Sequence, residues 1–124
     1  MEKILCVDDD SDLLCLYQEE LSEEGYRVIL AKDGKEALSK FAKEKPQVVV
    51  LDIRMPGMDG IETLNALLAK NRQVQVILNT AYPQYKENFM TWGAEAYVIK
   101  SSDLSELKHK VQEAMEKVRK ASKP

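Results

Sequence analysis

The sequence has 124 residues, of which 44% are hydrophobic and 31% charged, and its formal net charge is −3. This length favours one domain with a single hydrophobic core, and the charge gives no sign of a nucleic-acid or membrane surface. No apolar run approaches the roughly 20 residues of a membrane-spanning helix, and acidic residues follow the N-terminus too closely for a secretory signal. We therefore expect a cytoplasmic protein with one domain at residues 1–120 and a short tail at 121–124.

Five short apolar runs alternate with five longer amphipathic stretches along the chain. The runs are nearly continuous, which is typical of strands buried on both faces of a sheet. The stretches between them have helical periodicity, as in Leu14, Tyr17 and Leu21 at positions i, i+3 and i+7. The five predicted strands are Ile4–Val7, Val28–Leu30, Val48–Leu51, Val74–Leu78 and Ala96–Ile99.

Residues at the ends of the amphipathic stretches support these boundaries. Gly25 and Gly93 lie where a helix would end in a left-handed turn. Asp33 and Asp103 are each followed three residues later by glutamate, a pattern that predicts helix N-caps. Pro83 suits the first position of the fourth helix. Five helices are therefore expected between and after the strands.

Strands and helices that alternate five times predict an α/β fold with a parallel sheet. Crossovers between parallel strands are right-handed, and helices must cover both faces, so the sheet is doubly wound. We expect the flavodoxin-like strand order 2-1-3-4-5. In this order the switch point lies between strands one and three, and ligands bind there, at the carboxyl ends of the strands.

Polar residues follow these strands at the end where a ligand would bind. Carboxylates from neighbouring strands would crowd together there and repel one another. A hard divalent cation with oxygen ligands would relieve the repulsion, and a lysine would add a second positive charge. The sequence thus predicts a site that suits Mg²⁺. The residues concerned are Asp8, Asp9 and Asp10 after the first strand, Asp52 after the third, Thr80 at the end of the fourth and Lys100 after the fifth.

Taken singly, most of these residues have an ordinary structural explanation. Asp10 or Ser11 could cap the first helix, Thr80 could be an ordinary strand residue, and Lys100 could be a solvated strand end. Asp52 is harder to explain in this way, because it follows four apolar residues. The signal lies in their occurrence at successive strand ends, together with a loop after Asp52 that Pro56, Gly57 and Gly60 would shape.

Four motifs resemble the receiver domain of two-component response regulators: VDDD at the first strand, LDIRMPGMDG around Asp52, NTA at the fourth strand and YVIK at the fifth. The resemblance implies that Asp52 accepts a phosphoryl group from a sensor histidine kinase or a phosphotransfer protein. It also implies that Asp8, Asp9, Asp52 and the backbone carbonyl of Arg54 bind Mg²⁺.

The same resemblance implies that Thr80 and Lys100 contact the phosphoryl oxygens and that Tyr97 is an aromatic switch residue. The surface formed by the fourth helix, the fifth strand and the fifth helix would then change and bind a downstream protein. Such a module promotes its own phosphorylation and dephosphorylation and turns over no separate substrate.

Two departures from the family pattern affect the expected structure. Ser101 follows Lys100 where the family usually has proline, and a cis bond before serine would cost about 2.5–4 kcal/mol, so we expect a trans bond. The span from Thr80 to Gly93 is also shorter than usual by about two residues, roughly half a helical turn. The fourth helix should therefore be short or displaced. Its aromatic residues either fill the core or form a docking patch; they are Tyr82, Tyr85, Phe89 and Trp92.

Other functions remain open at this point. The chain could be the receiver part of a larger DNA-binding transcription regulator, a magnesium-dependent hydrolase with Asp52 as nucleophile, or a receiver-like module that is never phosphorylated. The basic tail KVRKASKP is either a helix end or the start of a linker. His109 lies off the apolar stripe of the last helix and is expected to be solvated.

Overall fold

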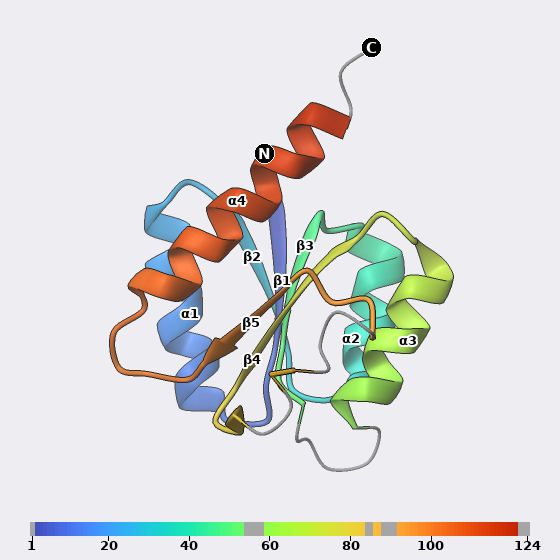
Figure 1. The fold of residues 1–124 in the computed structure, drawn as a ribbon. Helices are drawn as coiled ribbons and strands as arrows, with labels where there is room; N and C mark the ends of the chain where they lie inside the picture. Colours follow the sequence, from blue (N-terminus) through green and yellow to red (C-terminus); the bar gives the residue numbers. More distant parts are fainter. Residues whose placement is uncertain (1, 54–58, 84–85, 88–91, 122–124) are drawn as a thin grey trace.

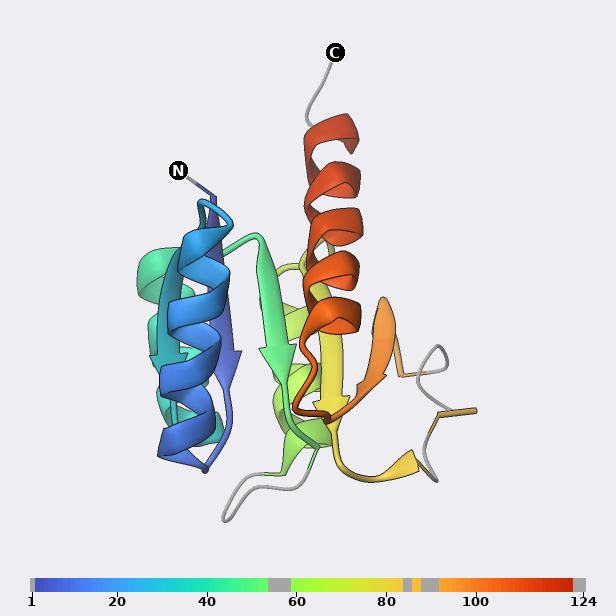
Figure 2. The same ribbon diagram turned by 90° about the vertical axis from the view of Figure 1, so that its left-hand side faces the viewer.

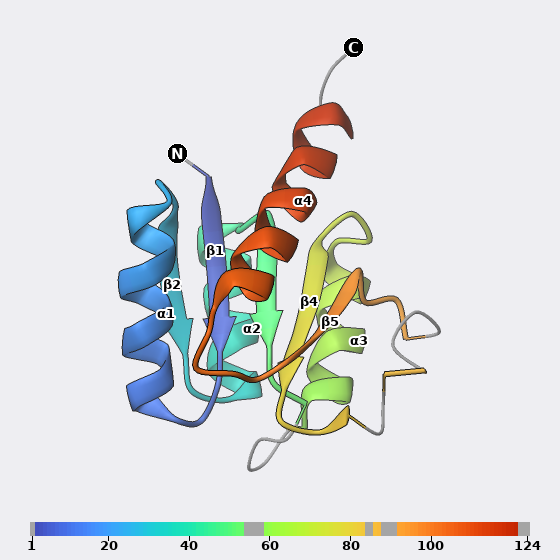
Figure 3. The ribbon, with the colours of Figure 1, turned by 60° about the vertical axis from the view of Figure 1, so that its left-hand side comes forward.

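The computed structural model describes residues 2–53, 59–83, 86–87 and 92–121. Five parallel strands form one sheet in the order β2-β1-β3-β4-β5, which confirms the predicted topology (Figure 3). The strands are β1 at Lys3–Val7, β2 at Arg27–Ala31, β3 at Val48–Leu51, β4 at Gln75–Thr80 and β5 at Ala96–Ile99. Because all five run the same way, their carboxyl ends meet at one edge of the sheet.

Helices cover both faces of the sheet, as predicted for a doubly wound fold. In Figure 1, α1 and α4 lie on one side and α2 and α3 on the other. Within the described residues there are four helices: α1 at Ser11–Glu23, α2 at Gly34–Glu44, α3 at Gly60–Lys70 and α4 at Ser105–Ala121. The helix expected to begin at Pro83, with Tyr85 and Phe89, falls mostly outside these residues.

The last helix, α4, is the fifth helix of the prediction and continues to Ala121. Its last turn carries the basic residues Arg119 and Lys120, which suits the negative end of the helix dipole. Figure 2 shows this helix rising past the end of the sheet opposite to the strand carboxyl ends. No helix in the described part of the chain is long and apolar enough to cross a membrane.

The hydrophobic core has one layer on each face of the sheet. Successive strand residues point to opposite faces, so Leu5 and Val7 pack with α2 and α3. Ile4 and Cys6 pack with α1 and α4. Each large aliphatic side chain buried in this way contributes about 1.5–3 kcal/mol, and the strands are therefore held rigidly between the two helix layers.

Local signals fix most of the element ends. Gly25 and Gly93 have φ values of 96° and 90°, which confirms the expected left-handed turns. Asp33 caps α2 by accepting a hydrogen bond from the Glu36 N–H at 2.8 Å. Asp10, and not Ser11, caps α1, since its side chain accepts hydrogen bonds from the first turn of the helix.

The predicted N-cap at Asp103 is wrong by position. The helix begins at Ser105, because the carbonyl of Leu104 accepts the first intrahelical bond, from the Lys108 N–H at 2.9 Å. The Asp103 carboxylate still accepts a hydrogen bond from the Ser105 N–H at 2.9 Å. The peptide bond after Lys100 is trans, as predicted, since the described residues contain no cis bond.

Candidate functional site

The site lies where the strands end, at the lower edge of the sheet in Figure 1. Val7, Leu51 and Leu78 stand side by side there, because the register pairs Val7 with Leu51 and Leu51 with Leu78. All three belong to the core layer under α2 and α3. Since strand residues alternate between faces, the residue that follows each of them points towards α1 and α4.

Those three residues are Asp8, Asp52 and Asn79, and we call them the polar row. The Asp52 N–H donates to the Val7 carbonyl at 3.1 Å, which continues the pairing of β1 and β3 beyond the last strand residue. Asn79 pairs with Val98 in β5, and Lys100 follows two residues later on the same face. Strand alternation and register thus bring the carboxylates and the lysine to one edge.

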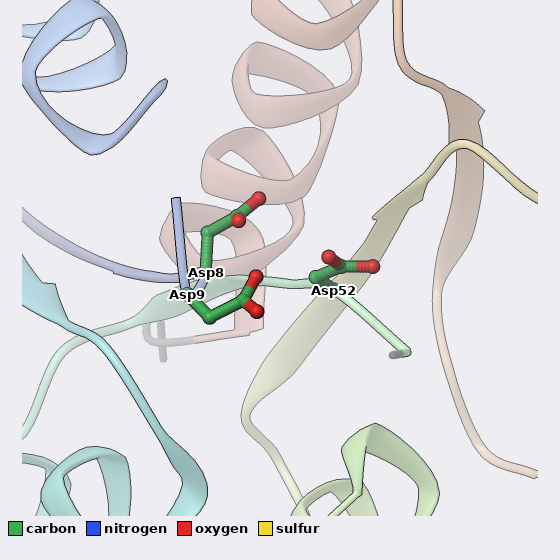
Figure 4. Close-up of side chains that lie close together, drawn as sticks. All are labelled: Asp8, Asp9 and Asp52. Atoms are coloured by element: carbon green, nitrogen blue, oxygen red, sulfur yellow. The ribbon is translucent and has the colours of Figure 1, made fainter. Parts of the chain in front are cut away.

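Three carboxylates lie close together at the ends of β1 and β3 (Figure 4). Asp8 is 1% exposed and Asp52 is 6% exposed, whereas Asp9 faces solvent. Each can offer one carboxylate oxygen, and the three oxygens lie within 4.8 Å of one another. Hard cations such as Mg²⁺ take oxygen ligands of this kind. The residues therefore fit a divalent cation, as the sequence predicted.

Lys100 neutralises part of this negative charge. Its Nζ lies 2.7 Å from Asp8 Oδ2 and 3.0 Å from Asp52 Oδ2. Burial acts to lower the pKa of Lys100, but its hydrogen bonds to Asp8 and Asp52 outweigh burial and raise the pKa to about 12. The ammonium therefore stays charged. The pKa of Asp8 is raised, because the burial of its carboxylate outweighs the stabilising contact with Lys100.

Gly60 allows α3 to begin directly against the carboxyl end of β3. The Gly60 N–H donates to the Ile53 carbonyl at 2.7 Å. A Cβ at Gly60 would lie 2.3 Å from the Asp52 carbonyl oxygen and 2.4 Å from Ile53 Cα, so any side chain there would force this backbone to shift. The start of α3 therefore requires glycine at this position. Pro56, Gly57 and Arg54 lie outside the described residues.

Thr80 and Tyr97 are linked to each other through the backbone of Tyr82. Thr80 is fully buried, and its Oγ1 accepts a hydrogen bond from the Tyr82 N–H at 3.3 Å. The Tyr97 hydroxyl donates to the Tyr82 carbonyl oxygen. The Lys100 N–H donates to the Thr80 carbonyl at 2.8 Å, so this group adjoins the carboxylates. Tyr97 is 5% exposed, and its ring already lies inside the protein.

The geometry matches a known family. Residues 4–112 match the family model of the response regulator receiver domain. The chain belongs to this family. It is a phosphoacceptor module of two-component phosphorelay signalling, not an enzyme that turns over a separate substrate, and the hydrolase hypothesis is therefore set aside.

Solved structures of receiver domains are similar over nearly the whole chain. The response regulator protein TrrA from Thermotoga maritima, in complex with Mg²⁺ and BeF, is 42% identical, with a TM-score of 0.86. The match covers 92% of this chain and 99% of that chain. TrrA also appears in a complex with the histidine kinase ThkA, where the TM-score is 0.85. A CheY-like receiver domain protein from Methanospirillum hungatei is 29% identical, with a TM-score of 0.91, and covers 98% of this chain and 99% of that chain.

Curated relatives differ in how much of their own length this chain matches. Sporulation initiation phosphotransferase F from Bacillus subtilis is 36% identical over 113 residues, which are 90% of this chain and 91% of the relative. The probable transcriptional regulator ycf27 from Porphyridium aerugineum is 37% identical over 98% of this chain and 51% of its own length. The chain therefore spans about half the length of that regulator.

Sequence reasoning missed one buried contact of the receiver domain. Asn79 Nδ2 donates to the Tyr17 hydroxyl oxygen at 2.9 Å, and both residues are 3% exposed. The signal was available, since an amide side chain in an otherwise apolar strand must find a hydrogen-bond partner. The ring of Tyr17 packs in the core as the apolar stripe of α1 predicts, and only its hydroxyl makes the additional contact.

Outside the site, His109 is exposed as predicted, and Cys6 belongs to the core. His109 is exposed, and its Nε2 lies 3.0 Å from Glu113 Oε1 on the same helix. Cys6 is fully buried, and burial, with a smaller effect of the Asp8 charge, raises the pKa of its thiol to about 12. Cys6 is therefore a core residue and no nucleophile near neutral pH.

Proposed function

We propose that Asp52 is the phosphoacceptor and that a histidine kinase, or a phosphotransfer protein, supplies the phosphoryl group from a phosphohistidine. The observation that carries the proposal is the convergence of three carboxylates and one ammonium at the end of β3. The histidine kinase complex of the relative TrrA supports this choice of partner. Phosphoryl transfer depends mainly on positioning and charge neutralisation, and the site offers both.

In this reaction a carboxylate oxygen of Asp52 attacks phosphorus while the P–N bond of the phosphohistidine breaks, and the imidazole of the donor histidine is the leaving group. Asp8, Asp9 and Asp52 would hold Mg²⁺, together with the backbone carbonyl of Arg54. The ion supplies charge neutralisation between the carboxylates and the incoming phosphoryl group. Lys100 is already 3.0 Å from Asp52 Oδ2 and can neutralise a further phosphoryl oxygen. The complex of TrrA with Mg²⁺ and BeF supports this choice of ion.

The assignment of Asp52 is tested with a small phosphodonor. With acetyl phosphate and Mg²⁺, mass spectrometry should show one added phosphoryl group on the wild-type protein and none on Asp52→Asn. The matched control is Asp12→Asn, which changes an exposed aspartate in the first turn of α1 and should be phosphorylated normally. An Asp52→Asn protein that still gained the phosphoryl mass would refute the assignment.

We further propose that phosphorylation changes the surface formed by the predicted fourth helix, β5 and α4, and that this surface binds a downstream protein. A phosphoryl group brings roughly −2 charge and three acceptor oxygens, which would draw Thr80 Oγ1 away from the Tyr82 N–H. Tyr97 would then lose or change its bond to the Tyr82 carbonyl. Since the Tyr97 ring is already buried, its part in the switch is a change in this hydrogen bond and not an inward movement of the ring.

This switch is tested separately from the site. Nuclear magnetic resonance spectra, recorded with and without phosphorylation, should show shifts at Thr80, Tyr82, Tyr97 and along α4. The exposed residues of α2 serve as the internal control and should stay unchanged. Phosphorylation without any shift at Thr80 and Tyr97 would remove the switch and leave the phosphoacceptor assignment standing.

Two contexts fit this module. The match over 91% of sporulation initiation phosphotransferase F favours a cytoplasmic phosphorelay protein. The match over half of the transcriptional regulator ycf27 keeps the alternative of a receiver in a DNA-binding regulator. The gene product beyond residue 124 decides between them: a DNA-binding domain would establish the second context.

A further inference from the structure

A buried hydrogen bond joins Tyr17 on α1 to Asn79 on β4, two elements that lie on either side of β3 at the site. Tyr17 belongs to α1, which follows the acidic pair at the end of β1, and Asn79 belongs to β4. β3 lies between β1 and β4 in the sheet. The bond therefore spans the strand that carries Asp52. Hydrogen bonds of 2.9 Å between fully buried groups hold their elements in a defined position.

The Lys100 side chain must also cross the end of β4, where Asn79 is the residue before the last. β4 lies between β5, which ends next to Lys100, and β3, which ends next to Asp52. The Lys100 ammonium nevertheless lies within 3.0 Å of Asp52 and 2.7 Å of Asp8. Its stem therefore passes over the end of β4, on the face to which the polar row points. The position of Asn79 consequently limits where the stem of Lys100 can lie.

The charges of Lys100 and Asp8 affect the pKa of the Tyr17 hydroxyl. Burial raises the pKa of Tyr17, while the hydrogen bond from Asn79 and the positive charge of Lys100 act in the opposite direction. The phenol is therefore neutral near pH 7, and its oxygen accepts a hydrogen bond from the Asn79 amide. An apolar pair in these two places would fill the same core without this directional contact.

We infer that Tyr17 and Asn79 are positioning residues for phosphoryl transfer, which hold the end of β4 so that Lys100 reaches Asp52. The inference rests on the proposed role of Asp52. It assigns no contact with the phosphoryl group to either residue. Their effect on the reaction is exerted through Lys100, which touches the reacting carboxylate.

The difficulty in testing this pair is that removing one partner also destabilises the core. Tyr17→Phe leaves the buried Asn79 amide without its acceptor, and such unpaired groups are costly. Replacing both partners by apolar groups of similar shape is nearly neutral for stability. The double variant Tyr17→Phe/Asn79→Leu therefore separates the two roles, because it restores packing and still lacks the hydrogen bond.

The experiment measures the phosphorylation rate with acetyl phosphate, per folded protein, for the wild type, Tyr17→Phe and the double variant. Urea unfolding gives their stability, and isothermal titration calorimetry gives their Mg²⁺ affinity. The control is Tyr26→Phe, which removes the hydroxyl of a half-buried tyrosine just before β2, at the opposite end of the sheet. Phosphorylation of the wild type at Asp52, and none of Asp52→Asn, is established first, so failure of the proposed function is recognised independently.

We expect the double variant to unfold at nearly the wild-type urea concentration but to react about tenfold more slowly at saturating donor, since small misplacements of reacting groups have effects of this order. Its Mg²⁺ affinity should stay within twofold of the wild type, and Tyr26→Phe should react normally. A double variant that recovers both stability and rate would show that the pair is only structural. A parallel loss of Mg²⁺ affinity and rate would also overturn the inference.

Discussion

The Asp8 carboxylate is buried beside a second carboxylate, and Lys100 alone among the described cations contacts both. Burial raises the pKa of Asp8 above its ordinary value of 3.8, even though Lys100 and the Asp10 N–H stabilise the charged form. In the absence of metal this charge therefore costs the folded state free energy. A cation bound to the same oxygens would offset this unfavourable free energy, and the gain would contribute to its binding affinity.

We predict that Asp8→Asn makes the metal-free protein more stable. Because the folded state has the higher pKa, it binds more protons than the unfolded chain just above pH 3.8, and the wild type loses stability as pH rises through this range. The variant should lack this decline. The difference in stability between the variant and the wild type should therefore increase with pH and then become constant. A rise in Tm of a few degrees at pH 7 is expected, since about 1 kcal/mol corresponds to roughly 4 °C in a domain of this size.

Added Mg²⁺ provides the control for this prediction. The ion should stabilise the wild type more than Asp8→Asn, because it binds the folded state through Asp8, Asp9 and Asp52. Thermal unfolding with and without Mg²⁺ therefore measures both effects in one experiment. A metal-free Asp8→Asn protein that melted below the wild type would contradict the electrostatic account of the site.

Individual residues differed in how well the sequence predicted them. Asp52 could be recognised because four apolar residues precede it, and a carboxylate in such a place needs compensation. Asn79 could not be assigned in the same way. Its partner Tyr17 is 62 residues away in the chain, so their hydrogen bond depends on how α1 packs on the sheet and not on any local pattern.

Among the elements, α3 is constrained most tightly by the site. Its first residue, Gly60, packs against the backbone of Asp52 and Ile53 with no room for a Cβ. The position of Asp52 thus depends on how closely this helix approaches the end of β3. The side chain of Asp59 completes the helix start by accepting a hydrogen bond from the Glu62 N–H at 2.9 Å.

We predict that Gly60→Ala destabilises the protein by about 1–3 kcal/mol, the usual effect of forcing an extra methyl group into a packed region. It should also slow phosphorylation at least tenfold, because the added Cβ must push the Asp52 backbone aside. Urea unfolding and the acetyl phosphate reaction measure the two effects.

Gly25→Ala is the matched control for this substitution. Its Cβ would meet no atom within 4 Å, and only its φ of 96° opposes the change. It should therefore lose about 1 kcal/mol of stability and react at the wild-type rate. Equal reaction rates for the two alanine variants would show that α3 does not position Asp52.

Element boundaries were predictable where one residue determines them and less so elsewhere. Gly25 and Asp33 end and begin helices as their chemistry dictates. Asp103 does not, because Leu104 follows it and takes the N-cap place while the carboxylate reaches past it to Ser105. Where several residues in a row can cap a helix, the packing of the helix determines the residue at which it begins.

At the scale of the whole molecule, the fold separates the site from the rest of the chain. The reactive carboxylates lie at the carboxyl ends of the strands, whereas β1 begins and α4 ends at the opposite edge (Figures 1 and 2). The alternation of apolar runs and amphipathic stretches determines this layout, so the sequence predicted the fold and the site edge. It could not predict the state of Tyr97, which depends on the packing of residues beyond Thr80.

The central claim is that Asp8, Asp9, Asp52 and Lys100 form one site for a cation and a phosphoryl group. A crystal structure with Mg²⁺ and beryllofluoride, a phosphoryl mimic, tests it most directly. The account predicts beryllium on a carboxylate oxygen of Asp52, Mg²⁺ held by Asp8, Asp9 and Asp52, and Lys100 in contact with fluorine. Beryllofluoride on another residue, or Mg²⁺ away from these carboxylates, would contradict it.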